Sequence, residues 1–280
     1  MAMTAGGCKL TGTTTRTLTM TSPQPKPLIG PMGSTSRRHF VYSMYCWTLF
    51  CVILLVFGAL IVLWPGPRAQ RRRVARCGAR LLFRSACIPL RVDGLDRLPK
   101  HPHILIANHA SFLDALILTA ALPASPGYAF VARQEFRSQA LLWPILRAVG
   151  TIILRPHTDH AAHANIERLR ERLEEGDNLV IFPEGAIARA PGLRPFHSGA
   201  FVIAARHGVP IVLAGMRGAR QALPLKTWQP VRTPLMVVVH AVWQPGDDHD
   251  GSPEDMAQAA REAMAPLAGE DIVPSTCSEP

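Results

Sequence analysis

The longest apolar segment of the chain runs from residue 40 to residue 64 and carries no charged side chain. As a helix it would be about 37 Å long at roughly 1.5 Å per residue, which is enough to cross the hydrocarbon core of a bilayer. Trp47, Trp64, Tyr42 and Tyr45 lie mostly toward its ends, as aromatic anchors at a membrane interface do. The pattern predicts one transmembrane anchor. A cleaved signal peptide is the alternative, but the leader is too long and no small-residue cleavage site follows.

A different pattern follows the anchor, in which short apolar runs alternate with longer periodic segments. The helix predicted at residues 161–175 has Ile166, Leu169 and Leu173 on one face and Gly176 as its stop, and a second helix is predicted at residues 111–122. About 180 residues of this kind suit one domain with a sizeable core. We therefore predict a single α/β domain with a central mixed, largely parallel sheet, preceded by one transmembrane helix. The predicted strands are residues 103–107, 129–132, 150–155, 180–185, 209–214 and 235–240.

The chain thus divides into four predicted parts. Residues 1–39 are rich in Thr, Ser, Gly and Pro and should form a disordered leader. An organellar transit peptide, or a true start at Met32 or Met44, are the alternatives for this leader. Residues 40–64 form the anchor, residues 65–246 the α/β domain, and residues 247–280 a C-terminal helix and flexible tail.

Positive charge is concentrated near the N-terminus of a chain whose formal net charge is +10. Thirteen Lys and Arg precede residue 92, whereas the first acidic residue is Asp93. These charges flank an apolar segment and no nucleic-acid module is recognisable, so a membrane surface explains them better than nucleic acid. More basic residues follow the anchor than precede it, and the positive-inside rule then puts the α/β domain on the cytoplasmic side. The three arginines at residues 71–73 act either as this topology signal or as contacts to anionic head groups.

Residues 108–114 carry the clearest candidate chemistry. They read Asn-His-Ala-Ser-Phe-Leu-Asp and follow a short apolar run. His109 therefore lies where a predicted strand gives way to a helix, at the edge of an α/β sheet where ligands commonly bind. A histidine and a carboxylate so placed form a general base with an orienting partner. The alternative is structural, because Ser111 and Asp114 also have the spacing of a helix N-terminal capping pair.

Two later strands deliver polar residues at the same end as the first delivers His109. Arg155 ends the strand at residues 150–155, and Glu184 with Gly185 ends the strand at residues 180–185. An arginine can bind phosphate oxygens with two parallel hydrogen bonds. Taken singly, Arg155 is better interpreted as a surface ion-pair residue and Glu184 as a turn residue.

These blocks together resemble the glycerolipid acyltransferase family, which includes the 1-acylglycerol-3-phosphate acyltransferases. The resemblance rests on Asn108-His109 with Asp114 five residues after the histidine, and on Phe182-Pro183-Glu184-Gly185 about seventy residues later. It covers roughly residues 80–245. It implies that residues 65–246 are an acyltransferase domain in which His109 takes a proton from a lysolipid hydroxyl while Asp114 holds the imidazole. It also implies that Arg155 pairs with the acceptor phosphate and that Glu184 and Gly185 hold the acceptor's polar head.

The same resemblance implies no covalent acyl-enzyme. Ser111 is then a cap rather than a nucleophile, and backbone N–H groups near Ser111 are the expected oxyanion donors. The chain departs from the family pattern where the acceptor is held: Ala186 and Ile187 stand where a hydroxyl residue and often an arginine are common, and His197 where a lysine is common. Arg189 and Arg194 either compensate or are solvated loop charges.

The resulting hypothesis is a membrane-bound O-acyltransferase, most consistent with acylation of 1-acylglycerol-3-phosphate. The partners it implies are a lysophospholipid, an acyl thioester carried by CoA or by acyl-carrier protein, and the bilayer. Acylation of lyso-ornithine lipid and a catalytically silent lipid-binding member of the fold are the alternatives. The six cysteines show neither paired spacing nor company with metal-ligand histidines, so we expect no metal and no other cofactor.

Overall fold

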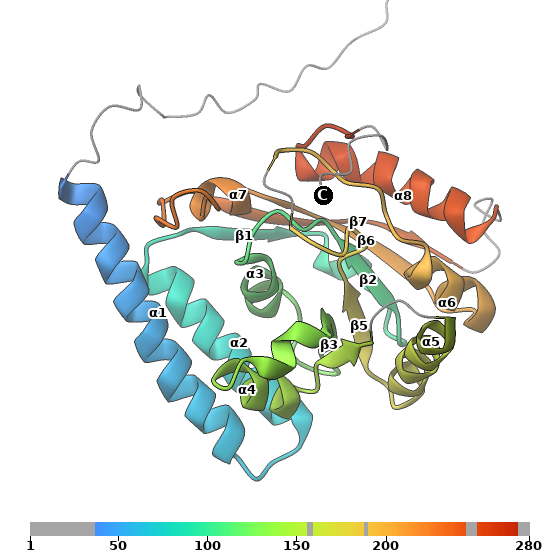
Figure 1. Cartoon of the computed structure of the whole chain (residues 1–280), viewed down its shortest axis with the longest axis horizontal. Helices are drawn as coiled ribbons and strands as arrows, with labels where there is room; N and C mark the ends of the chain where they lie inside the picture. The colour runs from blue at the N-terminus through green and yellow to red at the C-terminus, as the bar shows by residue number, and fades with distance from the viewer. Residues whose placement is uncertain (1–36, 156–158, 188–189, 245–250, 274–280) are drawn as a thin grey trace, which may run out of the picture. The chain divides into compact units, whose positions relative to one another are not determined.

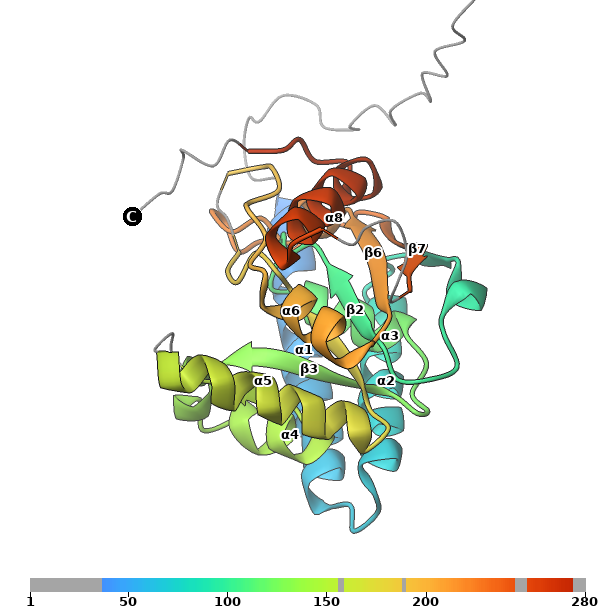
Figure 2. The ribbon, with the colours of Figure 1, turned by 90° about the vertical axis from the view of Figure 1, so that its right-hand side faces the viewer.

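A computed structural model describes residues 37–155, 159–187, 190–244 and 251–273. Its core is a seven-stranded sheet in the order β1-β7-β6-β2-β5-β3-β4, with helices on both faces (Figures 1 and 2). The strands are β1 (Leu90–Asp93), β2 (Ile104–Ala107), β3 (Tyr128–Arg133), β4 (Ile152–Leu154), β5 (Asn178–Ile181), β6 (Ile211–Arg217) and β7 (Leu235–Trp243). The helices are α1 (Arg37–Leu63), α2 (Arg68–Ser85), α3 (Asp114–Ala121), α4 (Leu142–Val149), α5 (Asp159–Glu174), α6 (Gly199–His207), α7 (Ala219–Ala222) and α8 (Pro253–Ala268), with 3₁₀ turns at Leu95–Arg97 and Gln134–Ser138.

Neighbouring strands of the sheet run parallel, except that β6 and β7 are antiparallel. The prediction of an α/β fold with a mixed, largely parallel sheet is therefore confirmed. The β6–β7 pair carries a register shift between Leu213 and Ala214. In this order β2 lies in the middle of the sheet, between β6 and β5, so the residues that follow β2 are flanked by the ends of two other strands.

Alternation along β2 shows how the two faces are filled. Leu105 and Ala107 face a cluster built with α2 and α3, while Ile104 and Ile106 face a cluster built with α5, α6 and α8. All four side chains are fully buried. A strand covered on both faces reads as a continuous apolar run, which is why its pattern could be recognised without a period of two.

The C-terminal helix belongs to the same core. Ala257, Ala260, Met264 and Ala268 of α8 are buried in the cluster that also holds Leu213 of β6. Figure 2 shows α8 lying over β6 and β7. The boundary expected at residue 247 therefore does not separate the helix from the domain core. The polar residues 245–250, which suggested that boundary, lie outside the described residues.

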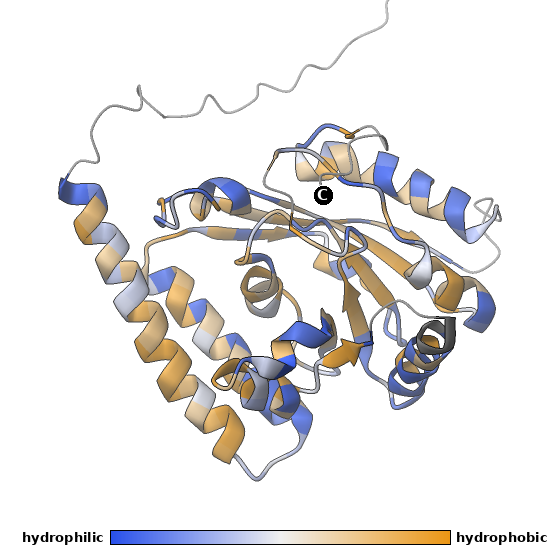
Figure 3. Ribbon diagram, in the orientation of Figure 1, coloured by the Kyte–Doolittle hydropathy of each residue, from blue (hydrophilic) through white to orange (hydrophobic). Residues whose placement is uncertain are grey.

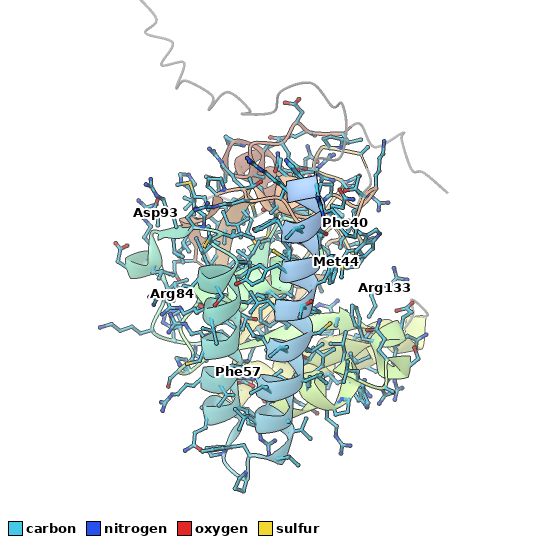
Figure 4. The ribbon with its side chains drawn as sticks, turned by 90° about the vertical axis from the view of Figure 1, so that its left-hand side faces the viewer. Phe40, Met44, Phe57, Arg84, Asp93 and Arg133 are labelled. Carbon is cyan, nitrogen blue, oxygen red and sulfur yellow. The ribbon has the colours of Figure 1, made fainter. Side chains whose placement is uncertain are left out.

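The predicted anchor forms α1, which is long and apolar enough to cross a membrane. It packs against α2 and α4 along its length, and its contacts run from the Tyr42 hydroxyl, 2.9 Å from the Ala86 carbonyl oxygen, to the Trp64 carbonyl, which accepts from Arg71. Gly78 of α2 permits the close approach, since a Cβ there would lie 2.8 Å from Phe57 of α1. Figure 4 shows the two helices side by side, and Figure 3 shows that hydrophobic residues make up much of the length of α1. Its exposed apolar side chains include Phe40, Val41, Met44, Val52, Leu55, Val56, Leu60 and Leu63.

The arginines of α2 are largely bound within the protein. Arg76 and Arg80 donate to the Ala121 and Ala120 carbonyls at the C-terminus of α3, where a helix dipole favours positive charge. Arg72 is buried and pairs with Asp177, and its Nη2 lies 3.0 Å from the second carboxylate oxygen. Arg172 of α5 pairs with the same carboxylate. Residues 71–73 were expected to act as a topology signal or as contacts to anionic head groups. The contacts of Arg72 indicate a third role, which is to hold the α1–α2 hairpin on the domain.

We expect Arg72→Met to lower the free energy of unfolding by about 3 kcal/mol, because removing one partner of a buried ion pair leaves a buried charge short of compensation. Denaturant titration of the detergent-solubilised protein measures this. The matched control is Arg73→Met, since Arg73 is the exposed neighbour on the same turn. A loss of less than about 1 kcal/mol for the Arg72 variant would show that the buried pair is not what holds the hairpin.

Candidate active site

The predicted catalytic residues lie at the carboxyl ends of adjacent central strands. β2 leads into Asn108 and His109, and its neighbour β5 leads into Phe182, Pro183 and Glu184. Asn108 is buried and exchanges two hydrogen bonds with the backbone of Met216 on β6, through its amide nitrogen at 3.1 Å and its amide oxygen at 2.7 Å. This ties the residue before the histidine to the other neighbouring strand, so His109 is held from both sides.

His109 and Asp114 form the pair expected from their spacing. The imidazole Nδ1 lies 2.8 Å from Asp114 Oδ2, and the Asp114 side chain is fully buried. Since the carboxylate accepts a hydrogen bond, Nδ1 carries the proton and the unprotonated Nε2 is the ring's basic atom. Burial raises the pKa of Asp114, while the hydrogen bond from His109 acts in the opposite direction.

The same carboxylate oxygen shapes the turn. Asp114 Oδ2 also accepts the backbone N–H of Ala110 at 2.7 Å and of Ser111 at 2.8 Å. These bonds hold residues 110–113 in a tight turn, so α3 begins at Asp114 rather than at residue 111 as the apolar pattern predicted. The N–H groups of Ala110 and Ser111 are thereby occupied, which leaves them poorly placed as the oxyanion donors expected near Ser111.

Ser111 was expected to cap the helix, and the structure gives it a related structural role in the turn before the helix. Its side chain is fully buried, and its Oγ accepts the N–H of Leu113 at 3.3 Å. The N-cap position of α3 is Leu113, which makes no side-chain cap. Ser111 therefore stabilises the turn before the helix rather than the first helical turn.

Phe182 is a site residue for which the sequence predicted no role of its own. Its ring stacks on the His109 imidazole, with centroids 4.2 Å apart and planes 16° apart. The stacking fixes the plane of the imidazole about the Nδ1–Asp114 bond. The signal available in the sequence was an aromatic residue at the end of a strand that pairs with the histidine's own strand.

Glu184 is buried, at 5% exposure, and bonds to the backbone on two sides. Its Oε1 accepts the N–H of His109 at 2.7 Å, and its Oε2 accepts the N–H of Arg194 at 3.1 Å. Burial raises the pKa of Glu184 to about 7, against the lowering effect of these two N–H donors. The carboxylate thus joins the end of β2 to the loop before α6, and its predicted contact with the acceptor stays a prediction.

Gly185 supplies a turn that few other residues could make. Its φ is +71°, and a Cβ at this position would lie 3.0 Å from Nε2 of His197. The His197 N–H donates to the Pro183 carbonyl at 2.9 Å, which brings its ring over the turn. His197, one of the departures from the family pattern, therefore lies against the Phe-Pro-Glu-Gly turn. Ala186 and Ile187 follow it, and Arg189 lies outside the described residues.

Arg155 lies at the same edge of the sheet but farther along it. It follows β4, three strands from β2, so roughly 14 Å separates the two strand ends at about 4.8 Å per strand. Its side chain is exposed, and its backbone N–H and C=O bond to the side-chain amide of Asn165 at 2.9 and 3.1 Å. The structure thus fixes its backbone and leaves its guanidinium exposed, while its contact with a phosphate stays a prediction.

An aromatic group beside the turn was not anticipated. Phe112, two residues before Asp114, stacks on Trp228 with centroids 5.0 Å apart, and both side chains are about half exposed. Trp228 adopts a left-handed φ of +53°, and its carbonyl oxygen accepts the indole N–H of Trp47 on α1 at 3.0 Å. The turn between His109 and Asp114 is thereby joined to the apolar helix α1 by three aromatic rings.

Comparison with known proteins gives a family to the part of the chain that carries this geometry. Residues 89–217 match the family model described as Acyltransferase. These residues form an acyltransferase-family domain. The match includes His109, Asp114, Arg155 and Glu184, and it confirms the family resemblance inferred from the two motifs.

Individual relatives act on lysolipids. A lyso-ornithine lipid O-acyltransferase from Pseudomonas aeruginosa is 30% identical over 139 residues, which is 50% of this chain and 52% of that protein. A 1-acyl-sn-glycerol-3-phosphate acyltransferase from Neisseria meningitidis is 27% identical over 165 residues, which is 56% of this chain and 62% of that protein. The chain thus spans about half or somewhat more of the length of these curated relatives.

The fold is shared with a solved structure. The crystal structure of the 1-acyl-sn-glycerophosphate (LPA) acyltransferase from Thermotoga maritima matches with a TM-score of 0.67 at 19% identity. The match covers 83% of this chain and 95% of that chain. At this identity the likeness concerns the acyltransferase fold alone.

The raised pKa of Glu184 predicts a pH-dependent stability. Between about pH 4.5 and pH 7 the folded protein holds a proton on Glu184 that the unfolded chain releases, so this group makes folding more favourable as pH falls. From pH 7.5 to pH 5.5 the free energy of unfolding of the wild type should gain about 2 kcal/mol relative to Glu184→Gln, at about 1.4 kcal/mol per pH unit below pH 7. Parallel urea titrations of the two proteins at the two pH values measure this. Asp114 is present in both proteins, so its contribution to the pH dependence cancels. If the difference in free energy of unfolding between the two proteins is the same at both pH values, Glu184 titrates at its ordinary pKa.

Proposed function

We propose that this chain is a membrane-bound O-acyltransferase that moves a fatty acyl chain from a thioester to the hydroxyl of a lysolipid. The observation that carries the proposal is the buried Asp114 carboxylate. One of its oxygens, Oδ2, accepts hydrogen bonds from His109 Nδ1 and from the N–H groups of Ala110 and Ser111. In the neutral imidazole this arrangement places the proton on Nδ1 and fixes the direction of Nε2, the ring's basic atom. The acyltransferase-family match over residues 89–217 supports the reaction class.

The proposed reaction follows from the acidity of an alcohol. An alcohol is not ionised at neutral pH, so its proton must leave as its oxygen attacks the thioester carbonyl, and His109 Nε2 accepts that proton. The new C–O bond forms, the C–S bond breaks, and the thiolate takes up a proton as it leaves. Asp114 stabilises the imidazolium formed in between, which is the role of the carboxylate in serine hydrolase triads. Neither a covalent acyl-enzyme nor a cofactor is required, since the thioester supplies the driving force.

The preferred acceptor is 1-acyl-sn-glycerol-3-phosphate, which would give phosphatidic acid. The family motifs and the Neisseria relative support this acceptor, with Arg155 as the candidate for its phosphate and with Glu184 and Gly185 near its polar head. The Pseudomonas relative supports a second candidate, lyso-ornithine lipid. Ala186 and Ile187, which lack the side-chain hydroxyl and charge common in the family, favour this second candidate. The acyl donor is acyl-CoA or acyl-carrier protein.

We further propose that the acyltransferase domain lies on the cytoplasmic side of the membrane. The sequence predicts that α1 crosses the membrane once, but the packing of α1 supports a position within one leaflet. The side of α1 opposite its exposed residues contacts α2 and α4 from Tyr42 to Trp64, so a crossing helix would carry the arginine-rich α2 into hydrocarbon. An α1 that lies in one leaflet keeps its exposed apolar side chains in lipid and the rest of the hairpin outside.

Acyl transfer can be tested with membranes containing the wild type, His109→Ala or Asp114→Asn, offered labelled acyl-CoA or acyl-carrier protein with each acceptor. We expect His109→Ala to lower kcat by at least 10²-fold, since a general base contributes about 10² to 10⁴ in rate. Asp114→Asn should lower kcat similarly, because an amide cannot accept all three N–H groups while stabilising the imidazolium. The acceptor that the wild type converts is thereby identified.

Ser111→Ala is the control for a covalent mechanism. Ser111 is fully buried and its Oγ accepts the Leu113 N–H within the turn, so this variant should keep more than a tenth of the wild-type rate. If it loses as much activity as His109→Ala, the serine is a nucleophile and direct transfer is wrong. If the wild type converts neither acceptor with either donor, a catalytically silent lipid-binding role replaces the enzyme.

The position of α1 can be tested with single cysteines at His39 and Lys100, introduced in a background without the native cysteines. Both positions are exposed, one near the start of α1 and one in the domain. With α1 in one leaflet, a membrane-impermeant maleimide should label both from the same face of sealed vesicles. Labelling of the two positions from opposite faces would establish a membrane-crossing α1.

A further inference from the structure

The segment after the family-matched region reaches the catalytic end of the sheet. Arg261 of α8 is buried, at 2% exposure, and its Nη2 donates to the Leu193 carbonyl at 2.7 Å and also to the Val273 carbonyl. Glu270, just beyond α8, accepts the Gly192 N–H at 3.0 Å while binding Arg220 in a two-point ion pair. Both residues lie outside residues 89–217.

Arg261 and Glu270 both bond to the loop of residues 190–198, which precedes α6. The Leu193 N–H donates to the Asp271 carbonyl at 2.8 Å, and the Val273 N–H donates to the Leu193 carbonyl at 3.1 Å, so Leu193 pairs with Ile272 in a short parallel bridge. Leu193 is fully buried. The loop is thus bonded to the C-terminal segment at its two positions before Arg194.

A continuous series of bonds leads from this loop to the base. The next N–H along the loop, that of Arg194, donates to Glu184 Oε2, and Glu184 Oε1 accepts the N–H of His109. Glu184 can hold both N–H groups well when ionised, because a protonated carboxyl converts one of its acceptor oxygens into a donor. Any movement of residues 192–194 therefore changes one of the two bonds that place Glu184 beneath His109.

Charge adds a second connection between Arg261 and the site. Burial lowers the pKa of Arg261 while the negative charge of Glu184 raises it, and the buried Nε of Arg261 makes no hydrogen bond. A buried guanidinium that binds two carbonyls and has an unbonded Nε is costly to keep, so a role beyond helix packing accounts for it better than stability does. The other groups around the Glu184 carboxylate are His109, Glu270 and, over the adjoining Gly185 turn, His197.

We propose that Arg261 and Glu270 are positioning residues for the reaction at His109, acting through residues 192–194 and Glu184. The assignment rests on the proposed acyltransferase function. It makes α8 and residues 270–273 part of the catalytic apparatus, although they lie beyond the family-matched domain. Neither side chain touches the reacting atoms; together they fix the position of Glu184, and Arg261 favours its ionised form.

The first test follows the hydrogen bonds directly, without acyl transfer. Hydrogen exchange of the full-length protein is compared for the wild type, Arg261→Met, Glu270→Gln and the control Arg217→Met. Arg217 also fastens α8, by donating to the Leu267 and Pro266 carbonyls, but it does not bond to the loop. We expect peptides containing the His109 and Arg194 amides to exchange at least tenfold faster in Arg261→Met and faster in Glu270→Gln, with no change in Arg217→Met. Unchanged exchange in Arg261→Met, or an equal increase in Arg217→Met, would overturn the proposal.

The second test measures kcat, KM and the pH dependence of kcat. With the acceptor that the wild type converts, Arg261→Met should lower kcat at least tenfold with KM within about twofold, since the base is misplaced while the substrate still binds. The acid limb of its kcat profile should move to higher pH, because removal of a positive charge favours protonation of Glu184. Arg261→Lys keeps the charge and one donor, so it should leave the acid limb in place and restore part of kcat. Wild-type kcat with an unmoved acid limb in Arg261→Met would refute the positioning role.

The two tests separate the possible failures. If no lysolipid is turned over but exchange at His109 responds to Arg261, the proposed function is wrong and the structural coupling stands. If the wild type turns over a lysolipid and exchange does not respond, the function stands and the positioning role is wrong.

Discussion

The Asp114 carboxylate is the interaction on which the site depends. One of its oxygens accepts three N–H groups, from the His109 ring and from the backbone of Ala110 and Ser111. The second oxygen is buried and has no hydrogen-bond partner. A carboxylate is expensive to bury, and the three donors are what offsets that cost. The turn geometry, the start of α3 and the orientation of the imidazole are therefore set by the same group and cannot vary independently.

The sequence predicted six of the seven strands and the pair His109–Asp114, because these depend on local patterns, but it missed the edge strand β1. An apolar run of four to six residues bounded by polar ones indicates a buried strand, and five residues are too few to place a histidine and a carboxylate far apart. What could not be predicted depends on contacts between distant segments. The stacking of Phe182 on His109 requires that β5 pair with β2, and the use of both Glu184 oxygens by backbone N–H groups requires the loop before α6 to return to the sheet.

The role of the C-terminal helix shows the same limit. The sequence predicted a helix after residue 247, which the structure places at Pro253–Ala268, but its polar surroundings suggested a tail separate from the domain. The helix is buried on β6 because small residues, Ala257, Ala260 and Ala268, let it approach closely, and Gly215 of β6 lies against Leu267. Small side chains carry little hydropathy, so this close contact left a weak signal in the sequence. The strands adjacent to it were recognised because their residues are larger.

The arginines of α2 serve two requirements at once. A run of arginines after an apolar helix is the signal from which membrane orientation is ordinarily predicted, yet Arg72, Arg76 and Arg80 are bonded to Asp177 and to the carbonyls at the end of α3. Charge-exchange experiments of the kind used to invert membrane topology would here break the attachment of the hairpin before they reorient it. A lysine at residue 72 would keep the charge but lose the planar fork that reaches both oxygens of Asp177. The side chains whose charge predicts membrane orientation are therefore also the side chains that attach the hairpin.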